Sequence, residues 1–121
     1  MQSYKDLEIY KLAHKIAVDI HNISLTLPSF EMYEEGSQIR RASKAISANI
    51  VEGFGRKRYR QDYIRFLVYA HSSCDETKEH LECLFETKSL KDNKIFEDLM
   101  EELDKLSKKM NKFIQAVDSG V

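Results

Sequence analysis

The sequence predicts an all-α fold, a single domain of residues 1–121 folded as an up-down, antiparallel and left-handed four-helix bundle. Three observations favour this class. One proline and four glycines supply few turns, 32% of the residues are charged, and apolar residues recur every three or four positions in four segments. In the last two segments the period is 3.5 residues, which is typical of left-handed, near-parallel packing, and short links make neighbouring helices antiparallel.

The first predicted helix covers residues 4–27 and ends before Pro28. One face carries its apolar residues, which are Ile9, Ala13, Ile16, Ile20, Ile23 and Leu27. Residues 29–36 show no sustained period, so we expect a connection there with room for one helical turn.

The second predicted helix covers residues 38–52 and has Ser37 as its N-cap. Its inner stripe consists of Ile39, Ala42, Ile46, Ile50 and Gly53. Small residues around that stripe allow another helix to approach closely. Gly53 and Gly55 are expected to end the helix in the manner of a C-cap.

The third and fourth predicted helices cover residues 59–87 and 92–117, and each carries a heptad seam. The seam of the third helix is formed by Tyr63, Leu67, Ala70, Cys74, Thr77, Leu81 and Leu84. The seam of the fourth is formed by Phe96, Leu99, Leu103, Leu106, Met110, Phe113 and Val117.

The first and third helices carry more apolar residues than one seam requires. The additional residues are Leu7, Tyr10, Leu12, Ala17, Val18, Tyr59, Ile64, Phe66, Val68, Tyr69 and Phe85. A second apolar stripe on a small bundle is often an oligomer interface, because a monomer would expose it to water. A single wide stripe facing the core explains the same pattern equally well. We expect a homo-oligomer, with the wide core as the alternative.

Positive charge is concentrated between Ser37 and Arg65. This stretch holds all six arginines and has eight basic residues against two acidic ones, a charge of +6, so the rest of the chain carries −7 to give the net charge of −1. Such a cluster is typical of nucleic-acid binding, because Arg and Lys neutralise phosphates while Tyr59 and Tyr63 are placed to stack on unpaired bases. The residues predicted to contact RNA, DNA or a nucleic-acid-handling protein are Arg40, Arg41, Lys44, Arg56, Lys57, Arg58 and Arg60.

Salt bridges are the alternative use of these arginines. Arg40, Arg41 and Arg65 have potential partners in Glu52 and in the acidic residues of the last two helices, within one subunit or between subunits. In that case the protein is a protein-only interaction or scaffold module. The turn at residues 56–60 is the part in which complete pairing is least expected.

Asn49, Glu52, Gly53 and Arg65 are predicted to serve packing and assembly. Asn49 lies beside the inner stripe of the second helix, where a buried amide fixes register or oligomer state at some cost in stability. Glu52 is the other polar residue of the small-residue helix that we expect to be specific.

We predict neither a catalytic site nor a metal site. Gly53 and Gly55 lack the third glycine and the preceding strand of a phosphate-binding loop, and no serine or cysteine has a recognisable nucleophile setting. His71 and His80 are nine positions apart on one helix and point to opposite sides of it. We therefore expect a protein without enzymatic activity and without a cofactor.

The two cysteines and the N-terminal residues indicate a cytoplasmic protein. Cys74 and Cys83 are about 13.5 Å apart if they share one helix, too far for a disulfide, so we expect reduced thiols. The first residues lack the continuous apolar run of a signal peptide, and no window approaches the roughly 18 apolar residues of a membrane span. No membrane partner is expected.

The run Gln38-Ile39-Arg40-Arg41-Ala42, followed by Asn49-Ile50-Val51-Glu52-Gly53 and Arg56, resembles the 23S rRNA intervening-sequence proteins, a family of small bacterial four-helix-bundle proteins. The similarity covers about residues 4–85. Supporting matches before and after these blocks are Tyr4, Leu7, Ile9, Tyr10, Ala13, Pro28, Glu31, Tyr63, Arg65, Phe66, Leu67, Ser73 and Glu76.

This resemblance implies a homo-oligomer, typically a pentamer, with no established enzymatic activity. A related group, the accessory variability determinants of diversity-generating retroelements, works with a reverse transcriptase and its RNA through a basic surface. The resemblance therefore implies further copies of the chain as partners, and an RNA, a DNA or a reverse-transcriptase-like protein as a possible additional partner.

Overall fold

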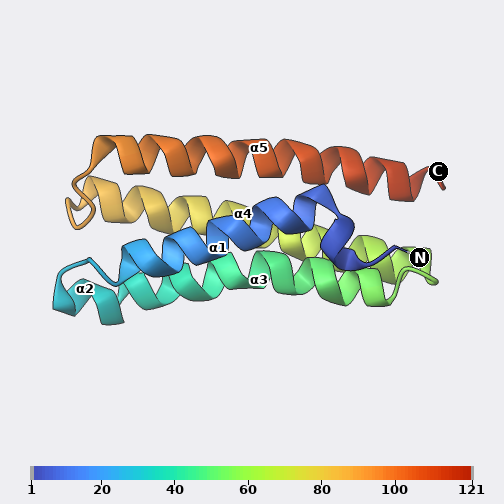
Figure 1. Cartoon of the computed structure of the whole chain (residues 1–121), viewed down its shortest axis with the longest axis horizontal. Coiled ribbons are helices and arrows are strands. Elements are labelled where there is room, and N and C mark those ends of the chain that lie inside the picture. Colours follow the sequence, from blue (N-terminus) through green and yellow to red (C-terminus); the bar gives the residue numbers. More distant parts are fainter. Residues whose placement is uncertain (1, 121) are drawn as a thin grey trace.

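The computed structural model describes residues 2–120 and confirms the all-helical class. These residues form a short 3-10 turn and five α-helices, without a strand. The elements are η1 (Tyr4–Asp6), α1 (Glu8–Ser24), α2 (Ser29–Tyr33), α3 (Glu35–Gly55), α4 (Arg60–Glu86) and α5 (Asn93–Asp118). The four long helices lie side by side, and successive ones run in opposite directions (Figure 1).

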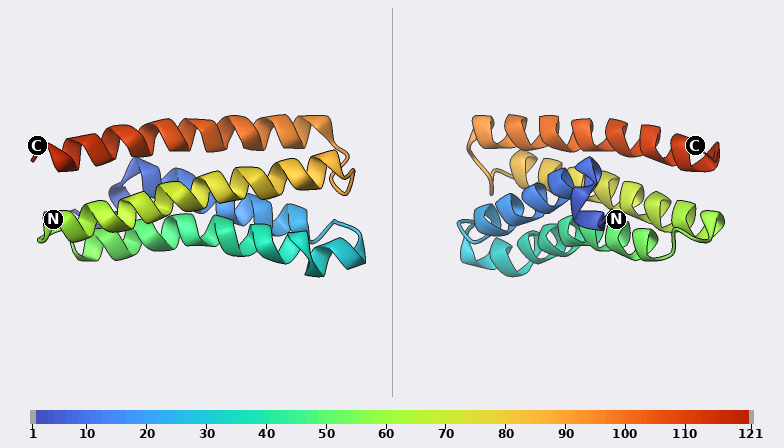
Figure 2. Two further views of the ribbon diagram at one scale, coloured as in Figure 1. Left: turned by 180° about the vertical axis from the view of Figure 1, so that it is seen from behind. Right: turned by 45° about the vertical axis from the view of Figure 1, so that its right-hand side comes forward.

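Helix α3 packs against both α1 and α4, while α5 packs against α4 and less extensively against α1. The α3–α4 turn lies at the same end of the bundle as the C-terminal end of α5, whereas α2 and the α4–α5 link lie at the opposite end (Figure 2). The two ends of the bundle therefore present different segments of the chain.

The predicted inner faces form the core. Every predicted stripe residue of α3 and α4 is buried, and so are the central residues of the α1 and α5 stripes. Four stripe residues near helix ends are only half-buried, and these are Ile23, Phe96, Phe113 and Val117. The 3.5- to 3.6-residue periods thus identified the buried faces, and these four residues pack against the edge of the core.

The first helix begins later than predicted from residue 4, because residues 3–6 cap one another. The Ser3 hydroxyl accepts a hydrogen bond from the Lys5 N–H at 3.2 Å, and the Asp6 carboxylate accepts one from the Ser3 N–H at 2.9 Å. This capping box starts the separate turn η1. Leu7 is buried in an extended conformation, with ψ 130°, and α1 starts at Glu8.

The same helix ends at Ser24, earlier than the predicted residue 27. The hydroxyls of Ser24 and Thr26 donate hydrogen bonds to the carbonyls of His21 and Ile23, each at 2.7 Å. Such bonds compete with the helical pattern, and Pro28 disfavours the helical conformation at the residue before it. The connection that follows contains α2, the one short helix expected there.

Helix α3 begins at Glu35, so the prediction of Ser37 as its N-cap is wrong. The buried carboxylate of Glu31 accepts hydrogen bonds from the Glu35 N–H at 3.2 Å and from the Ser89 hydroxyl at 2.6 Å. A carboxylate at this position also interacts favourably with the helix dipole. Glu31, which precedes the helix and lies in α2, has taken the role predicted for Ser37.

The prediction that Gly53 ends the second helix is also wrong, because α3 continues to Gly55. Gly53 is buried, and a Cβ atom placed on it would lie 3.1 Å from Cβ of Phe66 and 3.3 Å from Cδ1 of Tyr63. The glycine therefore serves the close approach of α3 to α4. The helix ends at Arg56, whose N–H donates to the Gly53 carbonyl at 2.9 Å.

The bounds predicted for the last two helices agree with α4 and α5 to within one residue. The Asp92 side chain caps α5 by accepting hydrogen bonds from the Lys94 and Ile95 N–H groups at 2.9 and 3.1 Å. Between residues 2 and 120, no helix combines the length and the apolar character that crossing a bilayer requires.

The additional apolar residues of the first and third predicted helices divide between core and surface. Leu7 and Ala17 are buried, which fits the wide core-facing stripe. Val18, Val68 and Tyr69 are 46%, 44% and 48% exposed, which leaves apolar surface on α1 and α4. The wide core-facing stripe thus accounts for Leu7 and Ala17, and the homo-oligomer stays a prediction for the exposed residues.

Candidate nucleic-acid interface

The α3–α4 turn carries the densest group of exposed cations. Residues 55–61 are all exposed, and Arg56, Lys57, Arg58 and Arg60 lie among them. Tyr59, the residue before α4, is extended and 62% exposed. The turn lies at one end of the bundle (Figure 1).

Arg56 and Arg65 are already paired. Arg56 lies 3.1 Å from the Glu52 carboxylate and 3.8 Å from Asp62, and Arg65 lies 3.1 Å from Asp62. Both guanidinium groups also lie over the Phe66 ring, at 4.9 and 5.5 Å from its centroid. The salt-bridge alternative thus applies to these two arginines. Arg56 links the end of α3 to the start of α4, whereas Arg65 is paired within α4. Since the side chains are about half exposed, each ion pair contributes only about 0.2–1 kcal/mol.

Lys57, Arg58 and Arg60 differ from this pair. Within residues 2–120, no carboxylate lies within 4.0 Å of any of the three. The Lys57 ammonium stacks over the Phe54 ring at 4.0 Å. The Arg60 guanidinium lies next to Gly120, just after the end of α5. A Cβ atom placed on Gly120 would be 2.7 Å from Nη2 of Arg60. These three side chains, which we call the turn cations, keep their charge available at the surface.

Arg40 lies in the opposite half of the bundle and has an internal role. Its guanidinium donates hydrogen bonds to the Ser24 hydroxyl and to the Met32 carbonyl, both at 2.9 Å. These bonds connect α3 to the end of α1 and to α2. Of the cations predicted to contact a partner, Arg40 and Arg56 are the two whose guanidinium groups donate hydrogen bonds inside the described part of the subunit.

Arg41 and Lys44 are exposed on α3 and form a separate group. Arg41 precedes Arg56 by fifteen residues, which places the two Cα atoms about 22 Å apart along the helix. Lys44 borders a surface groove between α1 and α3, together with His14 and His21. The predicted basic patch is therefore divided into the turn and a second group farther back along α3.

Tyr63 is placed in the core, and Asn49 forms a hydrogen bond within its own helix. Tyr63 is buried and packs edge-on against Phe113, and burial raises the pKa of its hydroxyl to about 12. It is not available to stack on a base, so that expectation is wrong. The half-buried Asn49 side chain donates to the Ala45 carbonyl of its own helix at 2.9 Å.

Histidine side chains bridge helices in a way that the sequence did not indicate. His71 contacts the Ser107 hydroxyl on α5 at 2.9 Å and lies 3.8 Å from Asp75, while His80 lies between the carboxylates of Glu35 and Glu76. The two rings face different neighbours, as their spacing predicts. Among the described side chains, no group of three or more potential ligands is placed to hold a metal ion. Ser107 lies within a helix, where backbone N–H groups are already hydrogen-bonded and offer no oxyanion site.

Both cysteines have free thiols. Burial raises the pKa of Cys74 to about 11, and its thiol faces the Leu103 carbonyl at 3.5 Å. A hydrogen bond to Glu79 is the main cause of the raised pKa of the half-buried Cys83. Both thiols are therefore mainly protonated at neutral pH, the less reactive state of cysteine.

The family model of the 23S rRNA-intervening sequence proteins matches residues 5–112. This chain belongs to that family. The match extends from η1 into the last turns of α5, farther than the blocks that carry the resemblance. A protein of unknown function from the S23 ribosomal protein family of Bacteroides thetaiotaomicron has a similar structure, with a TM-score of 0.75, 25% sequence identity, and coverage of 88% of this chain and 97% of that chain. No curated protein is significantly similar.

The sequence blocks that resemble this family both lie in α3, and the structure explains why the helix needs them. Ile39, Ile46 and Ile50 are buried in the core. Gly53 has no side chain and so allows α4 to pack closely against α3. Glu52 is exposed and pairs with Arg56, so this part of the pattern stabilises the start of the turn.

Proposed function

We propose that this protein is a non-enzymatic bundle with left-handed, up-down packing that assembles into a homo-oligomer, a pentamer by family resemblance, and binds RNA through the α3–α4 turn. The observation that carries the proposal is the set of turn cations. Lys57, Arg58 and Arg60 are exposed without an acidic partner within residues 2–120, although the chain has a net charge of −1. Cations left unpaired in an acidic protein favour an anionic partner.

The chemistry of the turn favours a single-stranded or looped nucleic acid. Three cations neutralise phosphates and release counterions, while the exposed Tyr59 ring offers a surface on which an unpaired base can stack. DNA offers the same phosphates and bases, so it belongs in the same assay. Assembly would present one turn per subunit, and several weak contacts on one RNA would add up to a stronger interaction.

Binding measured across a range of salt concentrations tests this proposal. The variant Lys57→Ala/Arg58→Ala/Arg60→Ala should bind structured RNA more weakly than the parent protein at low salt. The slope of log affinity against log salt should fall by about two, since each single-strand phosphate contact contributes roughly 0.7. Filter retention or fluorescence anisotropy with a hairpin RNA and a DNA of the same sequence gives both quantities.

A charge-matched control separates the turn from general charge. Lys11→Ala/Lys91→Ala/Lys105→Ala removes three exposed cations outside the turn and should leave affinity and slope nearly unchanged. A second variant, Arg41→Ala/Lys44→Ala, tests whether the separate basic group extends the RNA contact. Equal effects of the turn and control triples, or no effect of the turn triple, would refute the proposed contact.

A protein-only interaction module is the alternative function, and one observation favours it. Arg56 and Arg65 are held around Phe66 by acidic residues, and the exposed Val68 and Tyr69 continue this surface along α4. An apolar surface bordered by paired charges is suited to another protein, either a second subunit or a reverse-transcriptase-like protein. In that case RNA retention stays weak and insensitive to the turn cations, while assembly depends on Val68 and Tyr69.

A further inference from the structure

A cleft lies at the end of the bundle that carries the α3–α4 turn, because α1 is shorter than α5. Glu8, the first residue of α1, forms an ion pair with Lys109 at 3.2 Å. From Lys109, α5 continues for nine residues to Asp118, about 13 Å at 1.5 Å per residue. The last turns of α5 therefore have no α1 residue opposite them.

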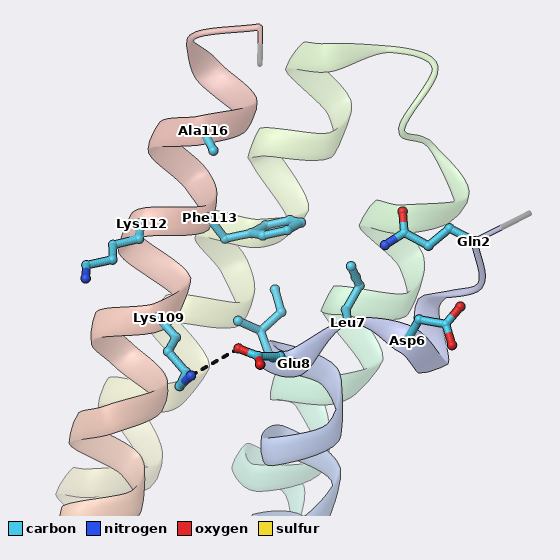
Figure 3. A pocket seen from close by; sticks show the side chains of 9 residues that line it. Gln2, Asp6, Leu7, Glu8, Lys109, Lys112, Phe113 and Ala116 are labelled. Atoms are coloured by element: carbon cyan, nitrogen blue, oxygen red, sulfur yellow. Dashed lines mark hydrogen bonds and ion pairs between the residues drawn. The ribbon is translucent and has the colours of Figure 1, made fainter.

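The cleft has a volume of about 510 Å³ and a partly apolar lining. Leu7 projects into it from the segment before α1, and the Phe113 ring projects into it from α5 (Figure 3). Ala116 lies one turn farther along α5 and has no side chain large enough to fill the space. A bulky apolar group from another molecule would therefore pack on an apolar surface formed by Leu7 and Phe113.

The heptad pattern of α5 reaches this cleft at Phe113, which is one of the residues that line it. Leu99, Leu103, Leu106 and Met110 are buried. The next seam residues, Phe113 and Val117, are only half-buried, although Phe113 packs edge-on against Tyr63. An apolar stripe that extends beyond its neighbouring helix is the geometry of a helix-binding groove.

Charges on the two sides of the cleft are opposite in sign. Lys112 borders it on the α5 side and has no carboxylate within 4.0 Å in the described part of the chain. Asp6 and Glu8 border it on the other side, where Glu8 pairs with Lys109. These carboxylates and the apolar surface make the cleft unsuitable for a phosphate backbone, so the turn cations and the cleft call for different partners.

We propose that the cleft binds one amphipathic helix of a partner protein, seated in the position that α1 leaves vacant. A leucine- or phenylalanine-like anchor of this helix packs on Leu7 and Phe113, and an acidic residue on its flank faces Lys112. The apolar anchor supplies most of the affinity, and the flanking charge selects the partner. This inference does not depend on RNA binding by the turn.

A synthetic helical peptide with a leucine stripe and glutamates along one flank serves as the probe. It should bind the full-length protein and shift backbone amide resonances at Leu7, Phe113 and Ala116. Ala116→Trp fills the cleft and should weaken binding more than tenfold. Lys112→Glu should weaken it about three- to tenfold, since one rim attraction is lost and a repulsion replaces it.

Lys108→Glu is the matched control, because it changes the same charge on α5 at an exposed position outside the cleft. Equal weakening by Lys108→Glu and Lys112→Glu, unchanged binding to Ala116→Trp, or no binding at millimolar peptide would overturn the proposal. A smaller assembly of Ala116→Trp in light scattering would also overturn it, since a second copy would then be the occupant. RNA retention by Ala116→Trp at the level of the parent protein separates this outcome from any failure of the turn contact.

Discussion

At the scale of single residues, two glycines two positions apart have different roles although both lie in the last turn of α3. A Cβ on Gly53 would meet Phe66 and Tyr63 at 3.1 and 3.3 Å, whereas nothing lies within 4 Å of a Cβ on Gly55. Neither has a positive φ. Alanine is therefore compatible with the backbone at both positions, and the difference between them is the distance to α4.

Alanine substitutions at these two glycines should change stability in opposite directions. Gly55→Ala should stabilise the protein by about 0.4–1 kcal/mol, because it restricts the unfolded chain without strain. Gly53→Ala should gain about as much in helix propensity but lose about 1–3 kcal/mol to overpacking against α4, giving a net destabilisation. Urea unfolding of the two variants measures the difference. Equal stabilisation by both would show that α4 is not held as close to α3 as the structure places it.

At the scale of elements, Arg40 connects three helices at the α2 end of the bundle. Arg40→Ala should destabilise the protein by about 1–3 kcal/mol, since the Ser24 hydroxyl and the Met32 carbonyl lose their half-buried donor. The neighbouring Arg41 is exposed, and Arg41→Ala should change stability by less than about 0.5 kcal/mol. Thermal or urea unfolding compares the pair, and equal losses would contradict the internal role of Arg40.

The helices were predictable from sequence more completely than their ends. Apolar periodicity depends on which face meets the core, so it identified the buried stripes of α3 and α4. Helix ends depend on particular hydrogen bonds, and some of these come from distant segments. Glu31 caps α3 from α2, and Gly53 serves packing although glycine is a common termination signal. The Ser3 and Asp6 pair is a missed cap that sequence spacing alone could have indicated.

At the scale of the whole molecule, the unpaired turn cations and the open cleft lie at the same end of the bundle (Figures 1 and 3). Composition located the cations, because six arginines fall within one stretch. It did not separate Arg56 and Arg65, which are paired, from Arg58 and Arg60, because composition does not show which arginines have a carboxylate about one helical turn away, as Arg56 has in Glu52 and Arg65 has in Asp62. The cleft could not be predicted from composition either, since it arises from the unequal lengths of α1 and α5.

The mass of the protein in solution, measured by light scattering with and without a hairpin RNA, tests the central claim most directly. The parent protein at micromolar concentration should have a mass several times that of one chain, with five chains expected, and RNA should add to that mass at low salt. The Lys57→Ala/Arg58→Ala/Arg60→Ala variant should assemble equally but gain little mass from RNA. A monomeric parent protein, or an equal gain of RNA mass by the variant, would contradict the account.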